Sequence, residues 1–86
     1  MLNPKSEKKV EIYSTPFCHF CHLAKDWLKE KGVEFVEYNV ATDLEKRKEM
    51  MELTGQLGVP VIKINEDIFL IGFNPDKLSQ ALNLTV

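Results

Sequence analysis

The chain has 86 residues, of which 44% are hydrophobic, and a formal net charge of -2. A chain of this size builds one modest core, so we expect a single domain at residues 10–86 behind a flexible tail at residues 1–9. Acidic and basic residues are interspersed, which argues against a nucleic-acid partner. No apolar stretch reaches the length of a membrane span and no export signal is recognisable, so we expect a cytoplasmic, soluble monomer with no membrane partner.

Short β-forming runs alternate with stretches whose apolar residues recur at helical spacing. The first run stops at Pro16, since proline cannot continue a central strand, and Gly32 and Gly55 stand where two helices would end. Asn74 can cap a last helix. In chain order, the sequence predicts a strand at Val10 to Ser14, a helix from about His19 to Lys31, a strand at Glu34 to Val40, a helix from Asp43 to Thr54, strands at Val61 to Ile64 and Ile68 to Ile71, and a helix from Pro75.

This order, β-α-β-α-β-β-α, limits the possible topologies. Two successive β-α-β connections predict parallel neighbouring strands reached by right-handed crossovers, and the closing hairpin adds an antiparallel edge. We therefore expect an α/β fold with a four-stranded mixed sheet flanked by three helices. The apolar residues expected to share helix faces are Phe20, Ala24, Trp27 and Leu28 in the first helix, Leu44 and Met51 in the second, and Leu78, Ala81 and Leu82 in the last.

The two cysteines, Cys18 and Cys21, stand where the first strand gives way to the first helix. Unpaired N–H groups at a helix start favour a thiolate, and this spacing allows a disulfide within one turn. We interpret Cys18 as a nucleophile and Cys21 as the thiol that resolves its mixed disulfides. The alternative is a pair of buried core cysteines. With no further cysteines to form a disulfide framework, a reducing compartment fits best.

Two histidines near the cysteines leave alternatives open. His19 either favours the thiolate through a partly charged imidazole or is a solvated residue at the helix start. His22 completes C-x-x-C-H, the pattern of covalent haem attachment, which we discount because no export signal or haem pocket is expected. Two thiols and two imidazoles could bind zinc, but they crowd into one short segment, so only a metal shared between two molecules stays open.

From Val10 to Leu82 the chain resembles a glutaredoxin or glutaredoxin-like protein of the thioredoxin superfamily. The resemblance rests on Val10-Glu11-Ile12-Tyr13 running into C-x-x-C, on Val59-Pro60, and on a turn at Gly72 before the last helix. It implies a thioredoxin-like fold with a cis Val59–Pro60 bond. It also implies that Val59 pairs through its backbone with glutathione or a peptide, and that Pro60 packs beside the dithiol.

The resemblance also implies a set of binding residues. At several of these positions the chain departs from the family pattern. His19-Phe20 replaces the Pro-Tyr of many glutaredoxins, and Thr15 stands where a glutathione-binding lysine is common. The segment from Ile71 to Asp76 looks more like the glutaredoxin-like electron donors of ribonucleotide reductase, which draw electrons from thioredoxin reductase. The substrate- or glutathione-binding candidates are Thr15, Pro16, Phe17, His19, Phe20, Val59, Pro60, Gly72, Phe73 and Asn74.

The activity expected from these features is that of a thiol–disulfide oxidoreductase. It would reduce protein or mixed disulfides through a Cys18/Cys21 cycle, in redox homeostasis and electron donation. No tightly bound cofactor is expected. The expected partners are protein disulfides, glutathione or thioredoxin reductase, and ribonucleotide reductase. Phe17, Phe20 and Phe73 would form an apolar rim or pack as half-buried residues. The rival functions are an iron–sulfur or metal carrier that uses Cys18 in a dimer, and a non-catalytic binding module.

Overall fold

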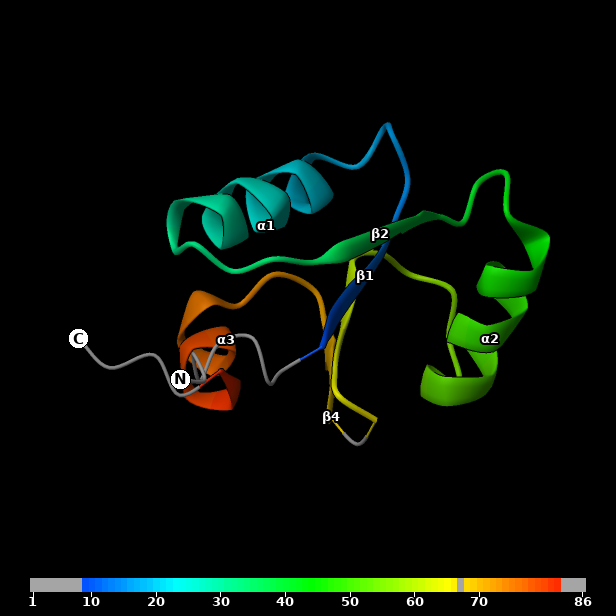
Figure 1. Cartoon of the computed structure of the whole chain (residues 1–86). Helices are drawn as coiled ribbons and strands as arrows, with labels where there is room; N and C mark the ends of the chain where they lie inside the picture. Colours follow the sequence, from blue (N-terminus) through cyan, green and yellow to red (C-terminus); the bar gives the residue numbers. More distant parts are fainter. Residues whose placement is uncertain (1–8, 67, 83–86) are drawn as a thin grey trace.

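Three helices pack against a four-stranded mixed sheet, as the sequence predicts (Figure 1). The computed structural model describes residues 9–66 and 68–82. Most of the predicted tail, and the turn residue Asp67, lie outside these residues. Lys9, placed in the tail, exchanges two hydrogen bonds with Asn65. The elements are β1 (Val10–Ser14), α1 (His19–Glu30), β2 (Val36–Asn39), α2 (Leu44–Thr54), β3 (Val61–Ile64), β4 (Ile68–Ile71) and α3 (Pro75–Ala81).

The strand order is β2-β1-β3-β4. Strand β2 runs parallel to β1, and β3 runs antiparallel to both β1 and β4. The prediction of two parallel crossovers is therefore wrong for the second one. The chain leaves β2 at Asn39, beside Ser14, and α2 returns it to the same end of the sheet, where Val61 pairs with Tyr13. This reversal delivers the residues that precede β3 to the carboxyl end of β1.

Local hydrogen bonds explain where the helices begin and end. The side chains of Asp43 and Asn74 accept the backbone N–H groups of Lys46 and Lys77, each at 3.1 Å, which confirms Asn74 as an N-cap and places Asp43 at the N-cap of α2. Helix α2 ends at Gly55, whose φ of 74° is left-handed, as expected of a C-terminal glycine. Strand β2 is shorter than the predicted Glu34 to Val40, because its pairing register with β1 covers only Val36–Asn39.

The main apolar core lies between the sheet and the helices α1 and α3, on the left of Figure 1. The inner face of α1 is formed by Cys21, Ala24 and Leu28, all fully buried, whereas Phe20 points outward and is 57% exposed. Leu78 in α3 and Leu82 at its C-cap are buried, and Ala81 is partly buried against the core. The buried residues of this cluster are Val10, Ile12, Ala24, Leu28, Val33, Ile62, Ile64, Leu78 and Leu82.

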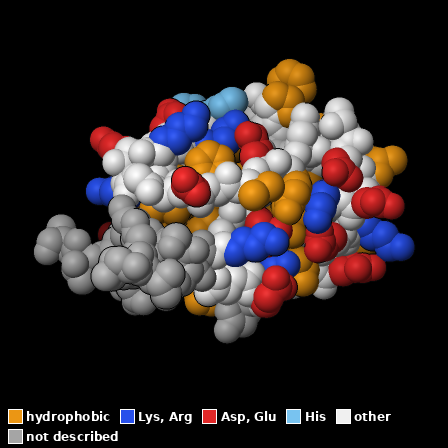
Figure 2. Space-filling view, in the orientation of Figure 1, with side chains coloured by type: hydrophobic (Ala, Val, Ile, Leu, Met, Phe, Trp, Pro, Cys, Tyr) orange, Lys and Arg blue, Asp and Glu red, His pale blue; other side chains and the backbone are white. Residues whose placement is uncertain are grey.

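Helix α2 covers the other face of the sheet, on the right of Figure 1. Met50 packs there against Tyr13 and Val61. The face shared by Leu44 and Met51 is exposed instead, and Figure 2 shows acidic and basic side chains over this side of the molecule. Among the described residues, no helix is long and apolar enough to cross a membrane.

Candidate active site

Cys18 occupies the N-cap of α1, with extended backbone angles of φ -95° and ψ 114°. Its sulfur accepts the backbone N–H of Cys21 at 3.2 Å, which is the contact expected of a thiol at a helix start. Both cysteines are free thiols, Cys18 partly exposed and Cys21 with no exposed surface. An incoming disulfide can therefore reach Cys18 directly but not Cys21.

The residues that precede β3, Val59 and Pro60, are distant from Cys18 in sequence, and Val59 contacts it in the fold. The Cys18 thiol donates to the Val59 carbonyl across 3.7 Å, and the Val59–Pro60 bond is cis, as the resemblance implies. Pro60 is buried, and its carbonyl accepts the Gly72 N–H at 2.8 Å. Of the predicted residues, Val59 contacts Cys18 directly, and Gly72 is joined to the neighbouring Pro60 by this backbone hydrogen bond.

The loop between β1 and α1 is tied back onto the helix. The Cys18 N–H donates to the Thr15 carbonyl at 3.3 Å. The His22 ring lies 2.9 Å from the Pro16 carbonyl through Nε2. His22, which the sequence singled out only as a haem or zinc ligand, is therefore placed as a loop anchor.

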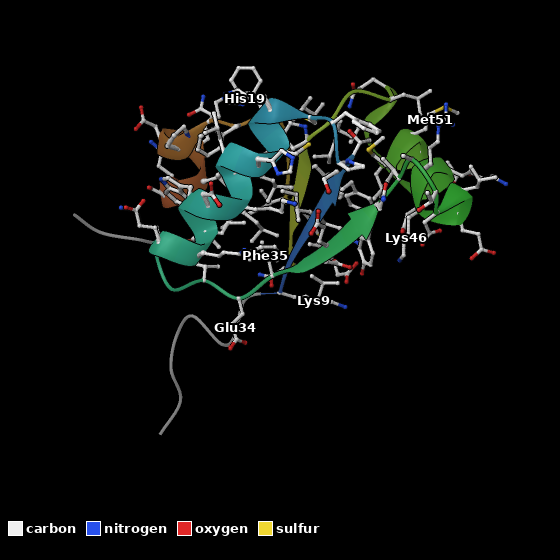
Figure 3. All side chains as sticks on the ribbon, turned by 90° about the horizontal axis from the view of Figure 1, so that it is seen from above. Lys9, His19, Glu34, Phe35, Lys46 and Met51 are labelled. Atoms are coloured by element: carbon white, nitrogen blue, oxygen red, sulfur yellow. The ribbon has the colours of Figure 1, made fainter. Side chains whose placement is uncertain are left out.

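The aromatic candidates divide into two groups. Phe17 is 93% exposed and Phe20 57% exposed, on either side of Cys18 in sequence, so neither ring packs as a half-buried residue. His19 is exposed and packs edge-on against Phe20, with ring centroids 5.6 Å apart; Figure 3 labels it on the outer side of α1. Phe73 instead packs half-buried against the core and Trp27. The Asn74 side chain is engaged as the cap of α3.

The two thiols differ in electrostatic environment. Burial, followed by the hydrogen bond with Cys18, raises the pKa of Cys21 to about 12. Cys21 is therefore almost entirely protonated at neutral pH. The Cys21 N–H points at the Cys18 sulfur and stabilises negative charge there. This geometry matches a nucleophilic Cys18 at the surface and a buried Cys21 that keeps its proton.

Three polar residues that the sequence analysis missed form a hydrogen-bonded cluster, and one of them, Lys25, acts on Cys21. The Glu37 carboxylate accepts hydrogen bonds from Lys25 Nζ at 2.8 Å and from Ser14 Oγ at 2.7 Å, both on Oε2. The Lys25 hydrogen bond lowers the pKa of Glu37. Lys25 could have been noticed one helical turn after Cys21, but nothing in the spacing of the sequence connects Glu37 to it.

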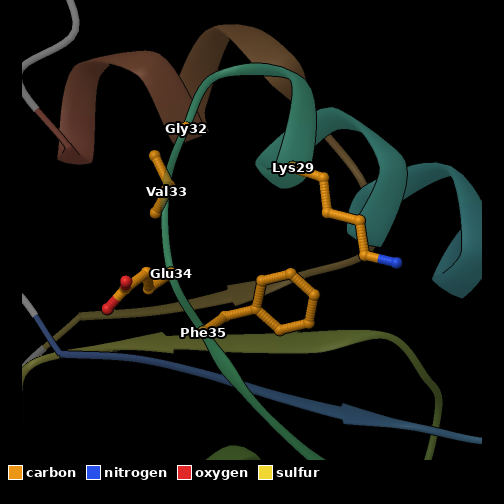
Figure 4. A pocket seen from close by; sticks show the side chains of 5 residues that line it. All are labelled: Lys29, Gly32, Val33, Glu34 and Phe35. Carbon is orange, nitrogen blue, oxygen red and sulfur yellow. The ribbon is translucent and has the colours of Figure 1, made fainter.

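A pocket of about 590 Å³ lies elsewhere, at the C-terminal end of α1 (Figure 4). It is lined by Lys29, Gly32, Val33, Glu34 and Phe35. Cys18 stands at the opposite end of the same helix. This pocket is therefore separate from the dithiol. Within residues 9–66 and 68–82, no group of three or more His, Cys, Asp or Glu side chains is arranged to hold a metal ion.

Comparison with known proteins identifies the family of this chain. The glutaredoxin family model matches residues 10–69. An uncharacterized glutaredoxin-like 8.6 kDa protein in the rubredoxin operon of Clostridium pasteurianum is 44% identical over 73 residues, which cover 85% of this chain and 96% of that protein. Glutaredoxin 3 of Escherichia coli strain K12 is 43% identical over 56 residues, 65% of this chain and 68% of that protein.

A solved structure extends the match to nearly the whole chain. The glutaredoxin-like protein NrdH-redoxin from Escherichia coli aligns with a TM-score of 0.71 at 27% identity, covering 91% of this chain and 96% of that one. With the family model and the relatives above, this alignment fixes both family and fold. The chain belongs to the glutaredoxin family and is a redox protein with the thioredoxin fold.

Proposed function

We propose that this protein is a thiol–disulfide oxidoreductase that reduces protein or mixed disulfides through a dithiol cycle of Cys18 and Cys21. One observation carries the proposal. The two thiols are in contact but unequal, since Cys18 is partly exposed and receives a backbone N–H, whereas Cys21 is fully buried and holds its proton. An accessible thiol in front of a buried, protonated thiol suits two successive steps of one reaction.

In the first step, the Cys18 thiolate attacks one sulfur of a substrate disulfide. A bond forms between Cys18 and that sulfur, the substrate disulfide breaks, and the released thiolate takes up a proton. In the second step, Cys21 loses its proton and attacks Cys18. The Cys18–Cys21 bond forms and the second substrate thiol leaves. Two electrons have passed to the substrate, and an external reductant restores the pair without a bound prosthetic group.

We propose that the substrate chain binds by pairing with the backbone of Val59. Its carbonyl faces the Cys18 sulfur, so an extended peptide or glutathione that pairs with Val59 would present its disulfide to Cys18. The exposed rings of Phe17 and Phe20 offer apolar contact on the same side. Phe73 and Asn74 are engaged within the fold, which leaves Thr15, Pro16 and Gly72 as further candidates near the dithiol.

Two reductants fit the proposal, and each has support. The similarity to Escherichia coli glutaredoxin 3 supports glutathione. The NrdH-redoxin, described as having a thioredoxin-like activity profile, supports thioredoxin reductase, and Thr15 supplies no cation for a glutathione carboxylate. We propose thioredoxin reductase as the electron source and ribonucleotide reductase or protein disulfides as acceptors. A cytoplasmic location would keep the thiols reduced.

NADPH consumption during reduction of a model disulfide tests this proposal. One arm contains glutathione and glutathione reductase, and the other contains thioredoxin reductase alone. Turnover in the second arm alone supports thioredoxin reductase as the electron source, whereas turnover that needs glutathione contradicts that choice. Cys18→Ser should lose all turnover in both arms. Turnover that survives Cys18→Ser would contradict the enzymatic proposal itself.

Cys21→Ser serves as the matched variant for the dithiol cycle. It should retain the first attack and accumulate a stable mixed disulfide between Cys18 and the substrate, detectable as added mass. The substituted residue keeps its size but lacks the resolving sulfur. Undiminished reduction of protein disulfides by Cys21→Ser would show that no dithiol cycle operates.

A further inference from the structure

The second step of the proposed cycle poses a problem that the two cysteines do not solve. Cys21 must ionise before it can attack Cys18, but the side chain is fully buried and its pKa is raised to about 12. Near neutral pH the thiolate is then a fraction of roughly one in 100,000. Any fixed positive charge close to Cys21 would accelerate this step.

The structure places such a charge one helical turn away. Lys25 follows Cys21 by four residues on α1, and residues at this spacing are neighbours on one face of a helix. Its side chain is only 17% exposed. The positive charge of Lys25 lowers the pKa of Cys21, in opposition to the larger effect of burial.

The ammonium group is held in place by a second element of the fold. Lys25 Nζ lies 2.8 Å from Glu37 Oε2 on β2, and Ser14 Oγ donates to the same oxygen at 2.7 Å. Ser14 is fully buried at the end of β1 and is followed by Thr15, whose backbone hydrogen-bonds to Cys21. Through Ser14, the polar cluster is therefore joined to the backbone segment that hydrogen-bonds to Cys21.

We propose that Lys25, held by Glu37 and Ser14, is a positioning residue that promotes ionisation of Cys21 during resolution of the mixed disulfide. The inference rests on the proposed dithiol cycle. The charged and titratable side chains that act on Cys21 are Lys25 and Cys18, and Glu37 on β2 is the carboxylate that holds the Lys25 ammonium group. His22 is bonded to the Pro16 carbonyl on the exposed side.

The chemistry balances without another reactant. Cys21 gives up its proton, its electron pair forms the bond to the Cys18 sulfur, and the bond from Cys18 to the substrate sulfur breaks. The leaving thiolate receives a proton from solvent. Lys25 keeps its own proton throughout and acts only through its charge, which favours the thiolate form of Cys21 over the thiol.

A stopped-flow reaction with dithiobis(nitrobenzoate) separates the two steps in the full chain. Attack by Cys18 releases one coloured thiolate, and resolution by Cys21 releases the second. Lys25→Gln should leave the first phase unchanged and slow the second about three-fold. Loss of the positive charge raises the pKa of Cys21 and lowers its thiolate fraction, and the greater nucleophilicity of the more basic sulfur restores part of that loss.

Two companion variants make the result specific. Lys25→Arg keeps the charge and should restore the second phase. Lys29→Gln removes an exposed charge one turn further along α1 and should behave as the wild type. The dithiol–disulfide potential at neutral pH should be the same in all variants, because reduced Cys21 is protonated in each. A structural disturbance would move the potential or the first phase.

The outcomes separate this inference from the proposed function. A wild-type protein that releases only one coloured thiolate has no dithiol cycle, and both proposals fail. Two phases in the wild type with an unchanged second phase in Lys25→Gln overturn the role of Lys25 alone. The role of Lys25 is also overturned if Lys25→Gln slows both phases. It is overturned as well if the second phase stays slow in Lys25→Arg.

Discussion

The two faces of the sheet are built on different physical principles. Toward α1 and α3, the buried side chains form a continuous aliphatic cluster that includes Ile12, Leu28 and Leu78. Toward α2, Tyr13, Met50 and Val61 share the face with a buried charged pair. The first face can gain stability from every buried side chain, whereas the second must first offset the cost of removing charges from water.

The charged pair is built into the strand register. Glu11 on β1 stands directly opposite Lys63 on β3, and both residues are buried, at 4% and 7% exposed. Lys63 Nζ lies 3.8 Å from Glu11 Oε1, and Tyr38 donates to Oε2 at 2.6 Å. Burial and the nearby Glu49 carboxylate raise the pKa of Tyr13 on the same face. This arrangement favours one register of β1 against β3.

The position of the dithiol follows from this difference. Cys21 lies on the inner face of α1, in line with Ala24 and Leu28, so its thiol is surrounded by the apolar side of the molecule. Desolvation there raises the pKa of Cys21. The packing that stabilises the fold therefore also holds the Cys21 thiol protonated. Four experiments test this difference between the two faces of the sheet.

Leu28→Ala should have the largest effect on stability. Leu28 has no exposed surface and joins α1 to both the sheet and α3, so its truncation removes apolar burial and leaves a cavity. We expect a loss of about 3–5 kcal/mol in the free energy of unfolding. Urea denaturation followed by circular dichroism measures it. A loss below about 1 kcal/mol would contradict the view that this face carries the stability.

Met50→Ala should destabilise the protein less, by about 2–3 kcal/mol, because the α2 face holds a smaller apolar cluster. Its neighbour supplies the control. Met51 is 46% exposed, so Met51→Ala should change the free energy of unfolding by no more than about 0.5 kcal/mol. Equal losses in the two variants, measured by the same denaturation, would show that α2 does not pack as described.

Lys63→Met should cost about 1–3 kcal/mol, because it leaves the buried Glu11 carboxylate without its nearest cation. The double variant Glu11→Gln/Lys63→Met should recover much of that loss, since it removes the uncompensated charge as well. A double-mutant cycle in urea measures the coupling. Additive losses in the two single variants would mean that the pair contributes nothing to this face.

The pH dependence of stability should reveal the protonated Cys21. Its pKa rises from 9.0 in the unfolded reference to about 12 in the fold, so the contribution is complete below pH 9 and disappears as the pH approaches 12. Reduced wild type should therefore lose stability relative to Cys21→Ser between about pH 9 and pH 11. Parallel unfolding profiles of the two proteins over this range would contradict the assignment.

The sequence by itself determined the local structure of this protein. Asp43 and Asn74 cap their helices through hydrogen bonds to residues three positions on, and Cys18 does the same for α1. Gly55 ends α2 with a left-handed turn. Such contacts join neighbours in the chain, so residue type and spacing are enough to predict them. The dithiol at a helix start was predictable for the same reason.

Only the tertiary structure decided what faces the dithiol. Val59 reaches Cys18 from 41 positions away because β3 runs antiparallel to β1, contrary to the expectation of a second parallel crossover. Glu37 meets Lys25 because of the register of β2 against β1. The inner face of α1 takes Cys21 rather than Phe20. These arrangements depend on long-range strand pairing and packing. The local spacing of residues does not predict the free energies of such contacts.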